Sequence, residues 1–221
     1  LERLGNLPVP PQATLIRNLC LMAENVQSDL RQTFLFFVPD FLHPRYANDP
    51  LAAEVGAAFR PLEGRSVIGA LKASRKIVEL VAIFGGQWPH SSYMIPGGVT
   101  RGATVREIVD CLDIVDQVTR FFESEVVGDT LDAWRAIDSA PAFFRWLDTP
   151  RHANSAIGLL TRFARSIGLH RNGAGAAHFL SAGAHYDAGA WTAPYGEQKT
   201  LLAAGVFDAA RGVCDPFDPA L

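Results

Sequence analysis

The apolar residues of the chain recur mainly at steps of three and four positions, which is the spacing of one helical face. The first such run predicts a long helix over residues 13–37. Pro39 should end it, because proline cannot continue the helical hydrogen-bond ladder. The apolar face of this helix would consist of Leu15, Leu19, Met22, Val26, Leu30, Phe34 and Phe37.

Two more long helices are expected further along the chain. One covers residues 66–84 and would end at Gly85-Gly86, since glycine adopts the left-handed cap conformation without steric cost. Another begins at Thr104 and stops at Gly128. The apolar stripe of that helix would consist of Val105, Ile108, Leu112, Val115, Phe122 and Val126. Shorter helices are expected over residues 49–59, 130–137, 141–147 and 154–169.

The pattern changes after Gly173. Residues 178–180 and 201–207 have the character of short strands, and a glycine-rich segment separates them. The predicted fold class is therefore mainly α, a bundle of long helices with a small β element near the C-terminal end.

The segment 87–99 is rich in glycine, proline and aromatic residues and poor in charge. It predicts a structured, largely buried loop. The glycine pairs at 85–86 and 97–98 bracket it, which suggests close approach of the backbone to a neighbouring element. His90 stands alone in this loop, either as a satisfied structural group or as a functional side chain.

Composition narrows the possible classes of protein. Of 221 residues, 48% are hydrophobic and 19% charged, which excludes a largely disordered chain. The net charge is only −3, and no basic block suggests a nucleic-acid groove. No apolar run is long enough to predict a transmembrane segment. The chain begins at Leu1 rather than Met and stops after a proline-rich turn, so we expect a fragment of a longer protein.

The potential ligand residues do not form a recognisable site. Cys20, Cys111 and Cys214 lie far apart, and no CxxC pair is present. We therefore expect neither a disulfide framework nor a zinc site, but small buried thiols. His178, His185 and Asp187 match no metal-ligand spacing, and structural roles are favoured for them. With no GxSxG elbow and no phosphate-binding loop, we predict no catalytic residue and no metal ligand.

The first long helix has a polar centre. Glu24, Gln27, Ser28 and Arg31 fall at spacings that place them on one side of the helix. This side is either a solvated face or a face that looks into a buried polar site, and both interpretations remain open.

Several segments, in order, resemble the large subunit of nickel–iron hydrogenases. They are PPQATLIRNL at 10–19, FGGQWPH at 84–90, PGGV at 96–99, GVFD at 205–208 and PFDP at 216–219. The stretch GGQWPHSSYMIPGGV is the most specific, and it looks closest to the uptake and hydrogen-sensing branches. The resemblance implies that residues 1–221 are the central part of a single large-subunit domain whose N- and C-terminal parts are missing.

The resemblance also implies chemistry that this chain cannot perform alone. In the family, two CxxC pairs hold nickel and bridge to an iron that carries carbon monoxide and cyanide, and the centre splits hydrogen heterolytically. Electrons leave through the iron–sulfur clusters of a small subunit. Because both CxxC pairs are absent, no cofactor is expected on these residues, and the isolated fragment should be inactive. The parent protein would be cytoplasmic, or membrane-associated through partner subunits.

A few residue roles carry over from the family. His90, with Gln87, Trp88 and Pro89, matches the loop that faces the small subunit near its first iron–sulfur cluster. Ser28 falls where some members carry an aspartate near the metals. Gln27, Ser28 and Arg31 are therefore candidates for a shell just behind the metal ligands.

Two other classes of protein are compatible with the sequence. One is a non-catalytic scaffold for hydrogenase maturation, which would resemble the large subunit but lack its cysteines. The other is a helical interaction domain without enzymatic activity.

Overall fold

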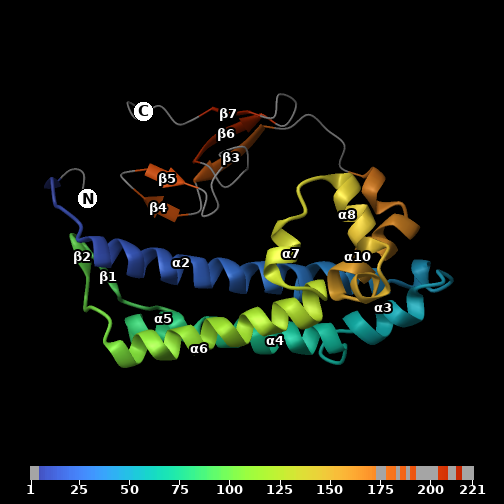
Figure 1. Ribbon diagram of the computed structural model, residues 1–221, viewed down its shortest axis with the longest axis horizontal. Helices are drawn as coiled ribbons and strands as arrows, with labels where there is room; N and C mark the ends of the chain where they lie inside the picture. The colour runs from blue at the N-terminus through green and yellow to red at the C-terminus, as the bar shows by residue number, and fades with distance from the viewer. Residues whose placement is uncertain are drawn as a thin grey trace.

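The computed structural model describes residues 5–172 in full and, beyond them, the backbone of five short strands at 178–182, 185–187, 190–192, 204–208 and 213–215 (Figure 1). Helices dominate the described part of the chain, as the apolar spacing predicts.

The first long helix is α2, Pro11–Arg31, and it continues through a wider turn, η1, Gln32–Phe37. Proline at its first position suits a helix start, where a backbone N–H would have no helical partner. The path then tightens into two short 3-10 turns, η2 at Val38–Leu42 and η3 at Pro44–Tyr46. The predicted helix over 13–37 is thus confirmed.

The second predicted long helix is divided. After α3, Ala52–Phe59, the chain forms α4, Arg65–Ile77, and α5, Glu79–Gly85, with a break at Val78 where ψ is −6°. The prediction of one continuous helix over 66–84 was therefore wrong at Val78. The break lets four apolar side chains within five positions all be buried, namely Ile77, Val78, Leu80 and Val81. Gly86 ends α5 in the left-handed conformation, as predicted.

Helix α6, Val105–Phe121, begins at a capping box in which Thr104 and Glu107 satisfy each other's backbone N–H groups. It continues through a wider turn, η4, Phe122–Val127, and stops at Gly128, whose φ is 71°. The bounds match the prediction, but most of the predicted stripe does not face the core. Val105, Ile108, Leu112 and Val115 are exposed.

The buried residues of α6 are Cys111, Ile114 and Val118. The apolar residues of this helix cover a wide arc of its surface, so the spacing alone could not decide which part of the arc is buried. The packing against α4 decides it. A methyl group at Gly69 of α4 would lie 2.6 Å from Cε2 of Phe121, so the glycine permits this close approach of the two helices.

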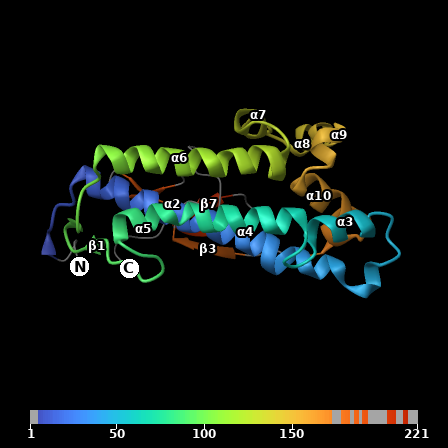
Figure 2. The same cartoon turned by 90° about the horizontal axis from the view of Figure 1, so that it is seen from below.

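Four short helices follow and pack together at one end of the molecule (Figures 1 and 2). They are α7 Leu131–Arg135, α8 Ala140–Leu147, α9 Pro150–Ala153 and α10 Ala156–Ser166, followed by the 3-10 turn η5, Leu169–Arg171. The helices predicted in this region are present, with α9 as an additional turn.

The long helices pack side by side (Figures 1 and 2). The rod of α4 and α5 runs antiparallel to both α2 and α6 and packs against each of them. One hydrophobic core joins α2, α5 and α6 beside the 86–99 loop, and a second core joins α2, α3 and α4 to α8 and α10. None of the helices in the described residues is both long and apolar enough to cross a bilayer.

The β structure is small. A hairpin of β1, Met94–Ile95, and β2, Gly98–Val99, lies inside the loop that follows α5. Beyond residue 172, β3 His178–Ala182, β6 Ala204–Asp208 and β7 Val213–Asp215 form one antiparallel sheet, and β4 His185–Asp187 pairs with β5 Ala190–Thr192. The strand predicted at 178–180 is present. Of the one predicted over 201–207, the last part is in β6 and residues 201–203 lie outside the described residues. The mainly α fold class with a small C-terminal β element is confirmed.

Two glycines in helices provide a matched test of this packing. A methyl group at Gly158 of α10 would lie 1.9 Å from the backbone oxygen of His152, whereas at Gly56 of α3 its nearest neighbour would be the flexible Arg60 side chain at 3.8 Å. We expect Gly158→Ala to lower the free energy of unfolding by about 2 kcal/mol or more, since backbone must move. Gly56→Ala should raise it by about 0.5–1 kcal/mol, the usual gain of alanine over glycine in a helix. Urea unfolding followed by circular dichroism would measure the free energy of unfolding of both variants. Equal changes in the two variants would contradict the close packing at Gly158.

Candidate functional site

The 86–99 loop lies along one face of α2. Three α2 residues hold it, Arg17, Cys20 and Glu24, and their spacing of three and four positions places them in a row on the helix. None of these contacts was predicted from the sequence, which had singled out Glu24 only as part of a polar centre. The row of contacts fixes the position of the loop relative to the helices.

Arg17 fastens the β1–β2 hairpin. Its Nη2 donates to the carbonyl oxygens of Ile95 at 2.9 Å and Gly98 at 2.6 Å, and its Nε donates to Gly98 at 3.2 Å. The backbone N–H of Thr100 donates to the oxygen of Tyr93 at 2.9 Å, which closes the base of the hairpin. Hydrogen bonds from a charged donor are among the stronger ones, so a single side chain orders this turn.

Cys20 and Tyr93 form the buried middle of the row. The thiol and the hydroxyl share a hydrogen bond, and both residues are buried. Burial is the main reason that the pKa of Cys20 rises to about 12, and the nearby Glu24 carboxylate raises it further. Burial also raises the pKa of Tyr93 to about 12. With both pKa values raised, the two groups are neutral at physiological pH, and they pack between α2 and the loop.

Trp88 and His90 are presented by the outer part of the loop. The indole Nε1 of Trp88 donates to Oε1 of Glu24 at 3.3 Å, and the ring is half-buried. Gln87 donates through Nε2 to the backbone oxygen of His90 at 2.8 Å. His90 has a positive φ of 66°, and its side chain is exposed, as are those of Gln87 and Pro89. The loop thus orders a Gln-Trp-Pro-His group whose polar ends face outward.

The prediction that this loop is largely buried was wrong. Within residues 87–99 only Tyr93 and Gly98 are buried. The reason is that the loop packs on the helices with one side only. The close approach inferred at its glycines is found at Gly85 only within the loop itself, where a methyl group would lie 2.6 Å from Cβ of Ser91. At Gly98 the nearest atom of α2, Cβ of Ala13, would lie at an ordinary 3.9 Å from such a methyl group, so a tight approach to another helix is not found there.

The structure separates the other predicted site residues of α2. Gln27 is buried, and its Nε2 lies 3.5 Å from the backbone oxygen of Ser74 on α4. Ser28 and Arg31 are exposed. The polar centre is therefore neither wholly solvated nor wholly buried, because Glu24 faces the loop, Gln27 faces α4, and the remaining two face outward.

Cys20 and Cys111 are buried free thiols, and burial raises the pKa of both. Within the residues whose side chains are described, no group of three histidine, cysteine or acidic side chains is placed to hold a metal ion. The side chains of Cys214, His178, His185 and Asp187 lie outside the described residues.

Sequence reasoning also missed a histidine network among the short helices. His152 Nε2 lies 3.0 Å from Oδ2 of Asp129, its Nδ1 lies 2.8 Å from the backbone oxygen of Trp146, and its ring stacks on that indole at 4.6 Å. The three residues join the end of η4 to α8 and α9. Their positions, 129, 146 and 152, fit no short motif, so only the tertiary structure shows the network.

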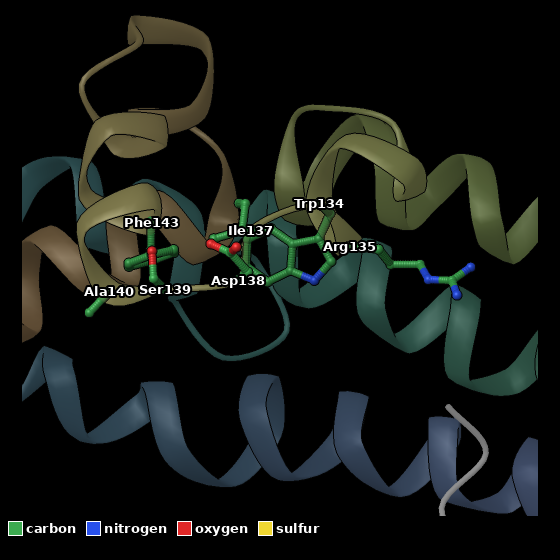
Figure 3. Close-up of a pocket in the computed structure, with 7 residues that line it drawn as sticks. All are labelled: Trp134, Arg135, Ile137, Asp138, Ser139, Ala140 and Phe143. Carbon is green, nitrogen blue, oxygen red and sulfur yellow. The ribbon is translucent and has the colours of Figure 1, made fainter. Parts of the chain in front are cut away.

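A hollow of about 590 Å³ lies between α7 and α8 (Figure 3). Its lining consists of Trp134, Arg135, Ile137, Asp138, Ser139, Ala140 and Phe143. The rings of Trp134 and Phe143 pack edge to face, with their centroids 6.2 Å apart. The Arg135 side chain extends away from the hollow (Figure 3). The lining contains no histidine or cysteine and none of the predicted site residues.

Comparisons with known proteins establish the fold. No protein-family model matches the chain. The structure matches the Ni-Fe-Se hydrogenase from D. vulgaris Hildenborough in the as-isolated oxidized state with a TM-score of 0.61 and 21% identity, over 97% of this chain and 38% of that one. The reduced state of the same D. vulgaris hydrogenase matches with a TM-score of 0.63 and 22% identity. The match again covers 97% of this chain and 38% of that one. The Ni-Fe-Se hydrogenase from Desulfomicrobium baculatum matches with a TM-score of 0.61 and 21% identity, over 96% of this chain and 39% of that one.

The chain therefore has the fold of one part of these hydrogenases and spans about two fifths of their chain length. This confirms the fold that the sequence resemblance implies, namely part of a larger hydrogenase-like chain.

Arg17 provides a test of how the loop is held. We expect Arg17→Met, which keeps the aliphatic stem but removes the donors to Ile95 and Gly98, to lower the free energy of unfolding by about 1–3 kcal/mol. Backbone amides of residues 93–100 should exchange with deuterium at least tenfold faster. Arg31→Met is the matched control, because Arg31 is exposed on the same helix. Unchanged exchange in the Arg17 variant would show that the hairpin is ordered by other contacts.

Proposed function

We propose that this chain is the central part of the large subunit of a nickel–iron hydrogenase. The observation that carries the proposal is the match of 97% of the chain to solved hydrogenases. The GGQWPH motif supports it independently, because its residues form an ordered loop whose polar groups face outward. In this proposal residues 1–221 belong to one domain of a longer polypeptide.

The nickel–iron centre, with its carbon monoxide and cyanide ligands, would be held by cysteines elsewhere in the longer polypeptide. When bound, it supplies the heterolytic cleavage of H2. The residues of this chain would act as the scaffold around it. Gln27, Ser28 and Arg31 remain candidates for a shell behind the metal ligands. The exposure of Ser28 and Arg31 leaves both able to face a further part of the protein.

The loop residues Gln87, Trp88, Pro89 and His90 would face the small subunit, whose iron–sulfur clusters take the electrons. Support comes from the way the loop is built. Its inner side is fixed to α2 through Arg17 and Glu24, and the imidazole of His90 has no hydrogen-bond partner among the described residues. A rigid loop with a free imidazole can offer a hydrogen bond to a partner without reordering its backbone. The cellular location of the protein would follow that of its partner subunits.

The full reading frame from which this chain derives, expressed with the neighbouring small-subunit gene and the maturation proteins, tests the function. We expect H2-dependent reduction of a viologen dye and about one nickel per large subunit by metal analysis. A stable, nickel-free and inactive product that co-purifies with maturation proteins would contradict the proposal and identify a non-catalytic assembly scaffold.

His90 tests the proposed electron path. In the active complex, His90→Gln should lower H2-dependent dye reduction at least tenfold, because the electrons must leave near this loop. Exchange of H2 with D2O, which occurs at the metal centre alone, should stay within twofold. Ser92→Ala is the control, since Ser92 is exposed in the same loop. Equal loss of both activities would place His90 in structural support of the centre instead.

A further inference from the structure

One face of α6 is apolar and exposed. Its residues are separated by three and four positions and run over three turns of the helix. We name them the outer stripe: Val105 (79% exposed), Ile108 (47%), Val109 (58%), Leu112 (64%) and Val115 (41%). A contiguous apolar surface of this kind marks a contact site more often than isolated exposed residues do.

The outer stripe adjoins the face that α6 already buries and turns away from it. At 100° per residue, Leu112 points away from Ile114 by about 160°, whereas Val115 points away from Val118 by only about 60°. Ile114 and Val118 are buried against the α4–α5 rod. The apolar surface of α6 therefore extends well beyond the part that the helix buries.

The polar residues of α6 occupy the remaining flank. Asp113 accepts a hydrogen bond from Gln117 at 2.6 Å, and both side chains are exposed. Asp116 pairs with Arg120 and marks the end of the stripe. A surface helix should carry one apolar face, whereas a wider apolar arc is typical of a helix inside a larger core. The sequence of α6 is thus suited to a helix covered on more than one side.

Nothing in the described residues covers the outer stripe. Figure 2 shows α6 at the edge of the long helices, with α4 and α5 on one side of it. The hydrogenase chains that share this fold extend well beyond the matched part, since 97% of this chain covers only 38% of the D. vulgaris Hildenborough chain. More than half of such a chain is thus available to pack around this part.

We propose that the outer stripe of α6 is an interface buried by a further segment of the same longer polypeptide, one that contributes apolar side chains at helical spacing. The inference rests on the proposed function, which makes the chain part of a longer subunit. It goes beyond that function by assigning the surface on which the two parts meet. Leu112, near the middle of the stripe, is the central contact.

A photo-crosslinking experiment on the complete subunit tests the occupant. The residue p-benzoylphenylalanine replaces Leu112, and in a control protein it replaces Gln117 on the polar flank. After irradiation, we expect the Leu112 position to crosslink within one chain, so that the subunit mass is unchanged. Peptide mapping should locate the crosslink between α6 and a residue outside residues 1–221. The yield of this crosslink from position 112 should be at least tenfold higher than from position 117. A product of twice the mass, an adduct with the small subunit, or no crosslink at all would overturn the proposal.

Thiol labelling provides a second readout that does not need a bulky probe. Leu112→Cys and Gln117→Cys are made separately in the complete subunit, and the rate at which each thiol reacts with a maleimide is measured. The labelling rate of the unsubstituted protein is subtracted from both. The buried native thiols Cys20 and Cys111 should contribute little. We expect maleimide to react at least tenfold more slowly at position 112 than at 117, with the difference lost in urea. Equal rates in the folded subunit would overturn the proposal.

Nickel content and H2-dependent dye reduction, measured on the same preparations, separate the two proposals. An active, nickel-containing subunit with a freely reactive position 112 would overturn the interface and keep the function. A protected position 112 in a nickel-free, inactive subunit would keep the interface and overturn the function.

Discussion

The burial of the α4–α5 rod between α2 and α6 is the constraint on which the rest of the structure depends. Small residues on the rod, among them Gly69, Ala70 and Ala73, let the neighbouring helices approach closely. Larger apolar residues near its end, Leu80 and Phe84, fill the space beside the loop. Because the rod contacts both neighbours, the orientation of α2 and the orientation of α6 are set by the same helix pair.

The orientation of α2 in turn decides what its polar side chains can do. With Ala23 and Gln27 facing inward, the row of Arg17, Cys20 and Glu24 falls beside the loop that leaves α5. The loop is then held from one side by a guanidinium, a buried thiol–phenol pair and a carboxylate. Its outer side is left to Gln87, Pro89 and His90. A segment that looks irregular in sequence is therefore held in a defined position by side chains of one helix.

The described side chains of this part of the fold are engaged mainly in packing and in holding the 86–99 loop. The two described thiols are neutral and packed in the core, and the apolar outer stripe of α6 is suited to contact rather than to catalysis. The likeness to solved hydrogenases extends across the helices and the C-terminal strands together.

By itself the sequence determined the extents of α2 and α6 with the wider turns that continue them, and it placed the apolar run that forms α4 and α5 without showing the break at Val78. It also determined their stops at Gly86 and Gly128, and the GGQWPH resemblance that identified the fold, because helical spacing and glycine caps are local properties. Only the tertiary structure decided that Ile114 and not Leu112 faces the core, that Gln27 is buried while Ser28 is exposed, and that the loop at 87–99 is held from one side. The physical reason is the same in each case. Periodicity gives the angle between side chains around one helix, but burial depends on which neighbour that helix meets, and contacts such as Cys20 with Tyr93 join residues far apart in the chain.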